Sequence, residues 1–354
     1  MAGQAVLYIF LLIIGFVLLV FGADLFVDGA SGIAKKLKVS TFVIGLTVVA
    51  IGTSLPEAAV SVVSAIQKNG DTLVGNVVGS NVLNILLILG IASLICKIPV
   101  EKSSQCIELP FLIAITGIFI GLGFWNGGYQ WYDGLILLAL YAAFMTYTIL
   151  MARRTRVTIA DGAVATQMES EAVTEVITQT YTGFNAFRAR VSFKFNELKE
   201  RTWFLILITV IGAGMVVGGA ELVVNSAEFI AIDLLKIDGK IVALTVVAFG
   251  TSLPELVTSV SAARKGDMGI ATGNIIGSNI ANLLFVAGLG FLCGGNYVIG
   301  FGTNDLIDAL VSLGCAALLL VCSLHKDKSL NRIKGVTMLL CLVGYYTCLI
   351  ITRI

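Results

Sequence analysis

Two stretches of this sequence are near copies of each other, and they decide the fold. Residues 52–90 read GTSLPEAAVSVVSAIQKNGDTLVGNVVGSNVLNILLILG, and residues 250–288 read GTSLPELVTSVSAARKGDMGIATGNIIGSNIANLLFVAG. They align without a gap at a constant offset of 198 residues. The similarity reaches further back, because GADLFVD at 22–28 parallels GAELVVN at 219–225. A repeat of this length predicts two structural units of one design.

The composition around these copies is that of a membrane protein. Of 354 residues, 57% are hydrophobic and 13% are charged, and the mean hydropathy is +0.97. A soluble domain carries about 25% charged residues, so soluble enzymes and secreted disulfide scaffolds are excluded. The net charge of +1 leaves no basic surface for nucleic acid. The seven cysteines form no C-x-x-C pair, and the single histidine, His325, excludes a His-rich metal site.

Ten apolar runs are long enough to cross a bilayer, which takes about 20 residues. The predicted fold class is therefore an all-α polytopic membrane protein with ten transmembrane helices. The predicted spans are about 5–27, 39–66, 72–95, 109–125, 133–152, 203–226, 240–263, 270–293, 305–323 and 335–352.

The basic residues predict the orientation of these spans. With the N-terminus outside, nineteen of the 23 lysines and arginines fall on the inner side, as the positive-inside rule requires. We therefore expect both termini outside and the long connection 153–202 in the cytoplasm. Within it, apolar residues three or four apart between 184 and 198 indicate either an amphipathic helix on the inner leaflet or a solvated tether.

The two copies are expected to lie in opposite orientations, because five spans, an odd number, fall within one offset. The predicted organisation is a first five-helix repeat over 1–152 and a second over 203–354. Their most similar parts cover about 45–95 and 243–293. Inverted repeats are an architecture of secondary transporters, whose substrate site lies near the midplane where the repeats meet.

Each copy carries one carboxylate in the middle of an apolar span, Glu57 in the first and Glu255 in the second. An acidic side chain at this depth costs several kcal/mol and indicates function by default. No lysine or arginine lies in the interior of these spans to pair with them. Pro56 and Pro254 precede the two glutamates and are expected to break the helices, which frees backbone carbonyls near the carboxylates.

Small polar residues continue this pattern along the next span of each copy. Glycines beside them would allow close packing of helices. The atoms available as metal ligands are carboxylate, hydroxyl, amide and carbonyl oxygens. Such oxygens suit a hard cation such as Ca²⁺ or Na⁺ and disfavour zinc and copper. The polar residues at intervals of four are Asn76, Ser80 and Asn84, then Asn274, Ser278 and Asn282; the glycines are Gly75, Gly79, Gly273 and Gly277.

GTSLPE followed by GNVVGSN, and GTSLPE followed by GNIIGSN, resemble the two alpha-repeats of the sodium/calcium exchanger family, in the calcium/cation antiporter superfamily. The resemblance implies that the motif residues line a central cluster of ion sites. Asparagine at 282, where potassium-dependent relatives have aspartate, implies independence from K⁺. The metal ligands so implied are Ala50, Thr53, Ser54, Glu57, Ser80, Asn84, Ala248, Thr251, Ser252, Glu255, Ser278 and Asn282.

The resemblance implies a multi-pass protein of the cell membrane that is an antiporter and not an enzyme. It would exchange Na⁺ for Ca²⁺ by alternating access without a cofactor, and its partners would be these ions and the lipid bilayer. An H⁺/Ca²⁺ antiporter is the alternative, because two protons on Glu57 and Glu255 balance one Ca²⁺ equally well. An ion channel is disfavoured by the inverted repeat, and an intramembrane hydrolase by the lack of a positioned base.

Overall fold

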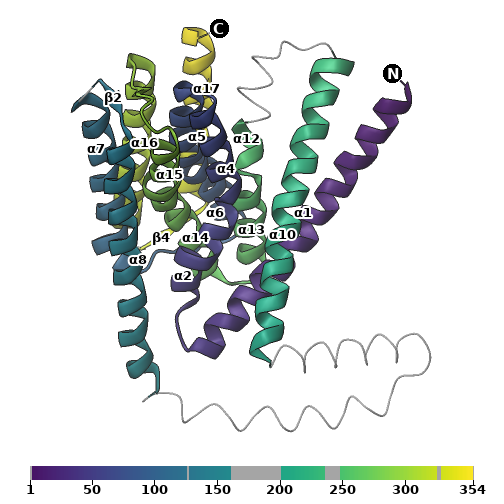
Figure 1. The fold of residues 1–354 in the computed structure, drawn as a ribbon. Coiled ribbons are helices and arrows are strands. Elements are labelled where there is room, and N and C mark those ends of the chain that lie inside the picture. Colours follow the sequence, from purple (N-terminus) through teal and green to yellow (C-terminus); the bar gives the residue numbers. More distant parts are fainter. Residues whose placement is uncertain (1, 126, 161–200, 236–247, 325–327, 354) are drawn as a thin grey trace.

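The computed structural model describes residues 2–125, 127–160, 201–235, 248–324 and 328–353, and almost all of them are helical (Figure 1). The first half contains α1 (Ala2–Leu37), α2 (Thr41–Ile44), η1 (Gly45–Val49), α3 (Ala50–Thr53), α4 (Leu55–Ile66), α5 (Gly70–Leu83), η2 (Asn84–Ile88), α6 (Leu89–Ile95), η3 (Ser104–Glu108), α7 (Leu109–Trp125) and α8 (Trp131–Ala160). The second contains α10 (Thr202–Phe229), η6 (Ile230–Leu234), α12 (Ala248–Thr251), α13 (Leu253–Arg264), α14 (Met268–Ala281), η8 (Asn282–Val286), α15 (Ala287–Cys293), α16 (Thr303–Leu324) and α17 (Arg332–Arg353). The segments labelled η are π-helical.

Most of the predicted spans appear as long apolar helices. Among the described residues, eight helical stretches are long and apolar enough to cross a membrane, and the pair Thr41–Thr53 and Leu55–Ile66, bent by 44°, raises the number to nine. The stretch α12–α13 begins directly after the undescribed segment 236–247, so the start of the span predicted over 240–263 lies outside the described part. A helical protein with many membrane spans is therefore confirmed.

Three helical stretches run further than the sequence suggests. The first ends at Leu37 instead of about residue 27, α8 continues to Ala160, past the expected end at 152, and α10 with η6 reaches Leu234, past the expected end at 226. Polar residues at a helix end do not stop the helix, because long basic side chains reach back to the interface while the backbone stays hydrogen-bonded. The amphipathic stretch predicted over 184–198 lies outside the described residues.

The most similar parts of the two repeats form the centre of the molecule. Within an apolar stretch of 18 residues in each span, 72% is buried in Gly70–Ile95 and 83% in Met268–Cys293. The corresponding share in Gln4–Leu37 is 17%. α14 packs against α2, η1 and α3 of the other repeat. The helices that carry the duplicated motifs are therefore surrounded by the rest of the chain.

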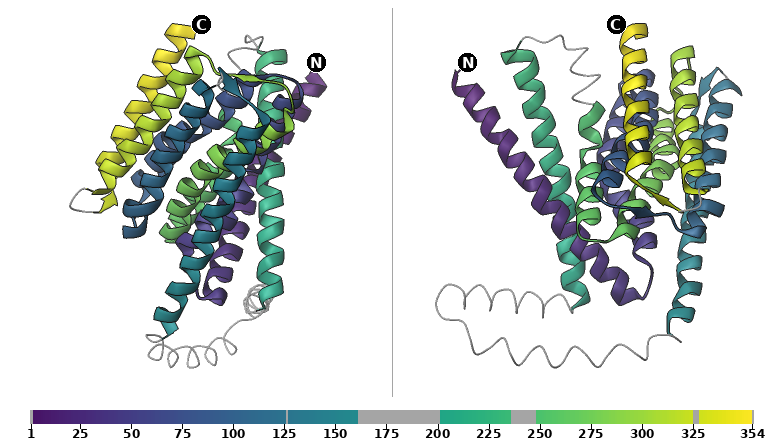
Figure 2. Two further views of the ribbon diagram at one scale, coloured as in Figure 1. Left: turned by 60° about the vertical axis from the view of Figure 1, so that its left-hand side comes forward. Right: turned by 180° about the vertical axis from the view of Figure 1, so that it is seen from behind.

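Helices α1 and α10 form a separate antiparallel pair at one side of this core (Figures 1 and 2). Tyr8 stacks on Phe229 at one end of the pair, with ring centroids 3.8 Å apart. Further along, a Cβ built on Gly212 would lie 2.5 Å from the backbone nitrogen of Phe26 and 2.8 Å from the carbonyl oxygen of Gly22. Only glycine allows the two backbones to approach so closely.

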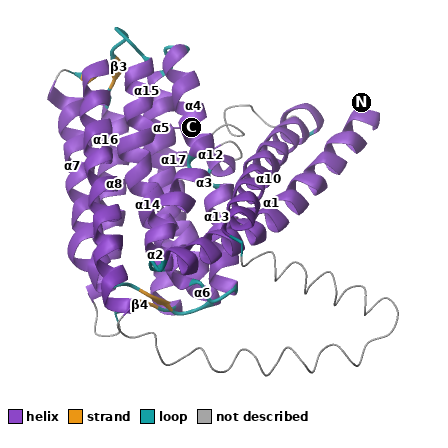
Figure 3. Ribbon diagram, turned by 60° about the horizontal axis from the view of Figure 1, so that its bottom comes forward, coloured by secondary structure: helices purple, strands orange, loops and turns teal. Residues whose placement is uncertain are grey.

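Two short antiparallel strand pairs join connections from opposite repeats. β1 (Ile98–Pro99) pairs with β4 (Ser329–Leu330), and β2 (Gly128–Tyr129) pairs with β3 (Ile299–Gly300). β3 and β4 lie at opposite ends of the bundle (Figure 3). The start of α1 and the end of α17 lie at one end, whereas α8 ends and α10 begins at the other (Figure 1).

Candidate cation site

The two GTSLPE motifs adopt the same broken-helix geometry. The break falls at Ser54, with φ −83° and ψ 7°, and at Ser252, with φ −88° and ψ 4°. Pro56 and Pro254 occupy the first turn of the helix that follows, where a missing N–H is tolerated. The predicted breaks beside the two glutamates are therefore confirmed.

The break puts each glutamate in the first turn of a helix, Glu57 in α4 and Glu255 in α13. A carboxylate is stabilised there by the positive end of the helix dipole. Both side chains are fully buried.

The second motif of each repeat ends in a π-helical turn. Asn84 is the first residue of η2 and Asn282 of η8, and each backbone carbonyl accepts from the residue five positions on, Leu89 and Ala287 respectively. π-turns are rare and occur frequently at functional sites. Both asparagine side chains are fully buried, as are Ser80 and Ser278.

Hydrogen bonds across the repeat boundary join the predicted ligands. Ser54 Oγ donates to Glu255 Oε1 over 3.2 Å, and Thr53 Oγ1 donates to Asn274 Oδ1 over 3.1 Å. Thr53 Oγ1 also lies 3.4 Å from Ser278 Oγ. The structure therefore brings residues about 200 positions apart into one polar cluster at the centre of the bundle.

The cluster is not symmetric. Ser252, the counterpart of Ser54, lies near Glu57, but its Oγ forms no hydrogen bond of normal geometry with that carboxylate. Asn76 is half-buried and donates to the carbonyl oxygen of Glu57 over 3.0 Å, whereas its counterpart Asn274 is fully buried. Thr251 is half-buried at the end of α12, and Ala248 starts that helix.

Sequence reasoning missed two serines and two asparagines of the cluster. Asn76 Nδ2 donates to Ser61 Oγ over 3.0 Å, and its counterpart Asn274 donates to Ser259 over 2.9 Å. Ser61 and Ser259 stand four residues after the glutamates, a spacing that could have revealed them. Asn81 and Asn279, the final residues of GSN in each motif, bond to Asn282 and Asn84.

The motif glycines pack differently in the two halves. A Cβ on Gly273 would meet the carbonyl oxygen of Phe42 at 2.3 Å, and one on Gly277 would meet that of Leu46 at 2.5 Å. For Gly75 and Gly79 nothing among the described residues lies within 4 Å. The segment equivalent to the one that contacts Gly273 and Gly277 is about 240–248 in the second repeat. Most of this segment lies outside the described residues. The expected close packing is thus seen for the second pair.

Several buried oxygen atoms of the cluster have no hydrogen-bond partner among the described residues. An unsatisfied polar atom costs about 1–3 kcal/mol, and more when it is charged, so the set requires an explanation. In the described part of the chain no group of three or more His, Cys, Asp or Glu side chains stands ready for a metal such as zinc, and oxygen atoms of this kind suit Ca²⁺ and Na⁺. The atoms are Oε1 and Oε2 of Glu57, Oε2 of Glu255, Oγ of Ser252 and Oδ1 of Asn84 and Asn282.

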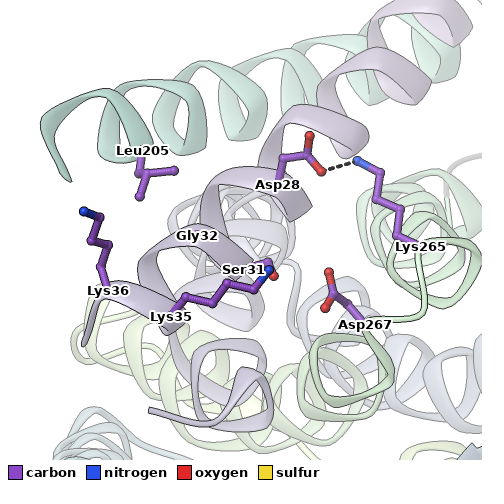
Figure 4. Close-up of a pocket in the computed structure, with 8 residues that line it drawn as sticks. All are labelled: Asp28, Ser31, Gly32, Lys35, Lys36, Leu205, Lys265 and Asp267. Carbon is purple, nitrogen blue, oxygen red and sulfur yellow. Dashed lines mark hydrogen bonds and ion pairs between the residues drawn. The ribbon is translucent and has the colours of Figure 1, made fainter. Parts of the chain in front are cut away.

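A second polar feature lies outside this cluster, where the end of α1 meets the turn between α13 and α14 (Figure 4). It is an open pocket of about 850 Å³. At its edge Lys265 Nζ lies 2.7 Å from Asp28 Oδ1 and 3.6 Å from Asp24 Oδ1, and Ser261 Oγ donates to Asp24. The counterpart of Lys265 in the first repeat is Gln67, which carries no charge, so the sequence does not duplicate this ion pair.

The fold and the cluster together define a class: a multi-span membrane protein with duplicated carboxylates where two repeats meet. The family model "Sodium/calcium exchanger protein" matches residues 7–150 and 204–351. The chain belongs to this family. The resemblance noted in the two motifs is therefore confirmed.

Individual relatives cover nearly the whole chain. The sodium/calcium exchanger MaX1 of Methanosarcina acetivorans is 33% identical over 96% of this chain and 97% of its own. The inner membrane protein YrbG of Escherichia coli is 33% identical over 79% and 78%. The structure of the sodium-calcium exchanger NCX_Mj soaked with 2.5 mM Na⁺ and 10 mM Sr²⁺ matches with a TM-score of 0.76 and 28% identity, over 97% of this chain and 99% of that one.

These matches establish the general activity. The family consists of membrane transporters, not enzymes, and it transports Ca²⁺ and Na⁺ without a cofactor. The chain is accordingly a cation/Ca²⁺ antiporter of a membrane.

Proposed function

We propose that this protein exchanges Na⁺ for Ca²⁺ at the central oxygen cluster. The observation that carries the proposal is the pair of fully buried carboxylates, three of whose four oxygens lack a partner among the described residues. Two uncompensated negative charges in a low-dielectric interior cost several kcal/mol each. A bound cation removes that cost, because it supplies the missing charge and fills the free coordination positions.

The charge of the cluster explains why the two ions would compete. Glu57 and Glu255 carry two negative charges, and one Ca²⁺ neutralises them. Two Na⁺ leave the site neutral, and three leave it at +1. Ca²⁺ and the full set of Na⁺ together would produce a large excess of positive charge. Exchange then follows, because one ion type must leave before the other enters.

The proposed ligands combine both repeats. The glutamates would bind both ion types, while hydroxyl, amide and backbone carbonyl oxygens would set the coordination number. The set consists of Thr53, Ser54, Glu57, Ser80 and Asn84 with Thr251, Ser252, Glu255, Ser278 and Asn282, together with the carbonyl oxygens of Ala50 and Ala248.

The proposed topology has ten transmembrane helices in two inverted repeats, 1–152 and 203–354. Both termini would lie outside the cell membrane and the loop 153–202 in the cytoplasm. The strand pairs support this arrangement, because the two connections joined by each strand pair lie on the same side of the membrane in the proposed topology.

Access to the site would alternate as α1 and α10 slide against the core. Their glycine contacts support motion as a unit.

The test is uptake of ⁴⁵Ca²⁺ into proteoliposomes that contain the purified protein. Outward gradients of Na⁺, K⁺ and H⁺ are compared at equal membrane potential. We expect the Na⁺ gradient alone to drive uptake. Uptake driven by the H⁺ gradient, with no response to Na⁺, would replace the proposal by H⁺/Ca²⁺ exchange at the same carboxylates.

A further inference from the structure

We propose that Asn81 and Asn279 are positioning residues, each of which orients the amide of a proposed ligand in the other repeat. Asn84 Nδ2 donates to Asn279 Oδ1 over 3.1 Å, and Asn282 Nδ2 donates to Asn81 Oδ1 over 3.1 Å. All four side chains are buried, with exposures of 0–1%. The inference rests on the proposed function, because it assigns a role in binding the same cations.

The chemistry of the amide makes its orientation important. One end of an asparagine side chain is an oxygen acceptor and the other end is an NH₂ donor. A cation is attracted by the oxygen and repelled by the NH₂ group. The two orientations have nearly the same shape, so packing alone selects weakly between them. A neighbouring acceptor that captures the NH₂ end selects the orientation in which the oxygen remains for the ion.

The free atoms fit this role. Oδ1 of Asn84 and Oδ1 of Asn282 have no partner among the described residues, whereas both Nδ2 groups are occupied. Each amide is thus held by its donor end, and its buried oxygen remains available. The contacts are reciprocal: the second repeat orients a ligand of the first, and the first orients one of the second.

Asn279 gives the cleaner test of the two positioning residues. Asn81 Nδ2 also donates to the backbone carbonyl of Asn279 over 3.2 Å, so replacing Asn81 would remove a second contact. Nδ2 of Asn279 has no partner among the described residues. Substituting Asn279→Leu therefore removes one acceptor and keeps a similar volume. Asn279→Asp keeps an acceptor oxygen at the same position.

The experiment is a double-mutant cycle read out by equilibrium ⁴⁵Ca²⁺ binding to purified protein, with thermal unfolding of the ion-free protein as the check on folding. The four proteins are the parent, Asn279→Leu, Asn84→Ala and the double variant. We expect Asn279→Leu to raise the Kd for Ca²⁺ about tenfold, which corresponds to about 1.4 kcal/mol. In the Asn84→Ala background the same change should alter the Kd by less than about twofold, because no amide remains to be oriented.

Each other result has a distinct meaning. Equal losses in both backgrounds would overturn the inference, because they would show that Asn279 acts by packing alone. If Asn84→Ala binds Ca²⁺ like the parent, the proposed site fails, and the inference fails with it. If Asn279→Leu does not fold, Asn279→Asp decides: it should bind Ca²⁺ at least as tightly as the parent, and a tenfold loss would contradict the role as acceptor.

Discussion

The two buried glutamates are the residues on which the proposed exchange depends most directly. Neither forms an ion pair within the described part of the chain, and neither side-chain oxygen of Glu57 accepts a hydrogen bond of normal geometry there. Glu255 accepts one hydrogen bond, from Ser54. A neutral donor offsets only part of the desolvation of a carboxylate. Both side chains should therefore depend on the transported ions for their charge balance.

Replacing either carboxylate by its amide should abolish exchange. Glu57→Gln or Glu255→Gln removes half of the charge that balances Ca²⁺. Loss of a charged ligand costs roughly 2–3 kcal/mol, so we expect Na⁺-driven ⁴⁵Ca²⁺ flux in proteoliposomes to fall by about 30- to 150-fold. Asp71→Asn, the same chemical change on an exposed residue of α5, is the control and should retain the flux. Near-normal flux in both glutamine variants would refute the site.

Among the elements, α1 and α10 are held together by a row of close glycine contacts. A Cβ on Gly22 would lie 2.6 Å from Met215 Cβ, and one on Gly219 would lie 2.8 Å from Leu19 N. Together with Gly212, these positions lie along one continuous seam. A pair packed in this way behaves as one rigid body, because separation of the helices would lose dispersion contacts along the whole seam.

A methyl group in this seam should therefore destabilise the protein. We expect Gly212→Ala to lower the stability by about 1–3 kcal/mol, the usual cost of overpacking, and to slow exchange. Gly214→Ala is the matched control on α10, because a Cβ there would meet nothing within 4 Å among the described residues. Thermal unfolding in detergent compares the two. Equal melting temperatures for the two variants would contradict the prediction, because they would show that the helix pair accommodates a methyl group at residue 212 without loss of stability.

For the whole molecule, the ratio of ions exchanged determines whether the cycle moves charge. If three Na⁺ replace one Ca²⁺, each cycle transfers one net charge, and a potential of 100 mV biases exchange by about 2.3 kcal/mol. An inside-negative potential should then accelerate Na⁺-driven Ca²⁺ extrusion, with cooperative dependence on Na⁺. Liposomes clamped with valinomycin provide the measurement. Flux indifferent to potential, with a Hill slope near one, would require an electroneutral cycle.

The long connection should be dispensable for exchange. Nothing in 153–202 resembles the repeats. We expect that replacing about residues 165–185 with a short flexible linker leaves the ⁴⁵Ca²⁺ flux of the purified protein within about twofold of the parent, because long surface loops are tolerated thermodynamically. A variant that unfolds at the parent temperature but no longer transports would show that this segment takes part in the cycle.

The sequence by itself determined the membrane class, the repeats and the position of the helix breaks. Each follows from local chemistry: apolar runs exceed the bilayer thickness, and prolines lack the N–H that a continuous helix needs. The family is equally explicit, because GTSLPE and GSN recur in both halves. Glu57 and Glu255 are conspicuous for the same reason, since an acidic residue in an apolar span is costly wherever the helix lies.

Only the tertiary structure decided which side chains of the two repeats meet. A fixed offset identifies equivalent residues, but equivalence does not say that Thr53 contacts Asn274 or that Asn84 contacts Asn279. Asn81 and Asn279 lie off the stripe of residues spaced by four, so helical periodicity did not select them. Hydrogen bonds across the repeats depend on helix packing to within fractions of an ångström, which arises from contacts between segments about 200 residues apart.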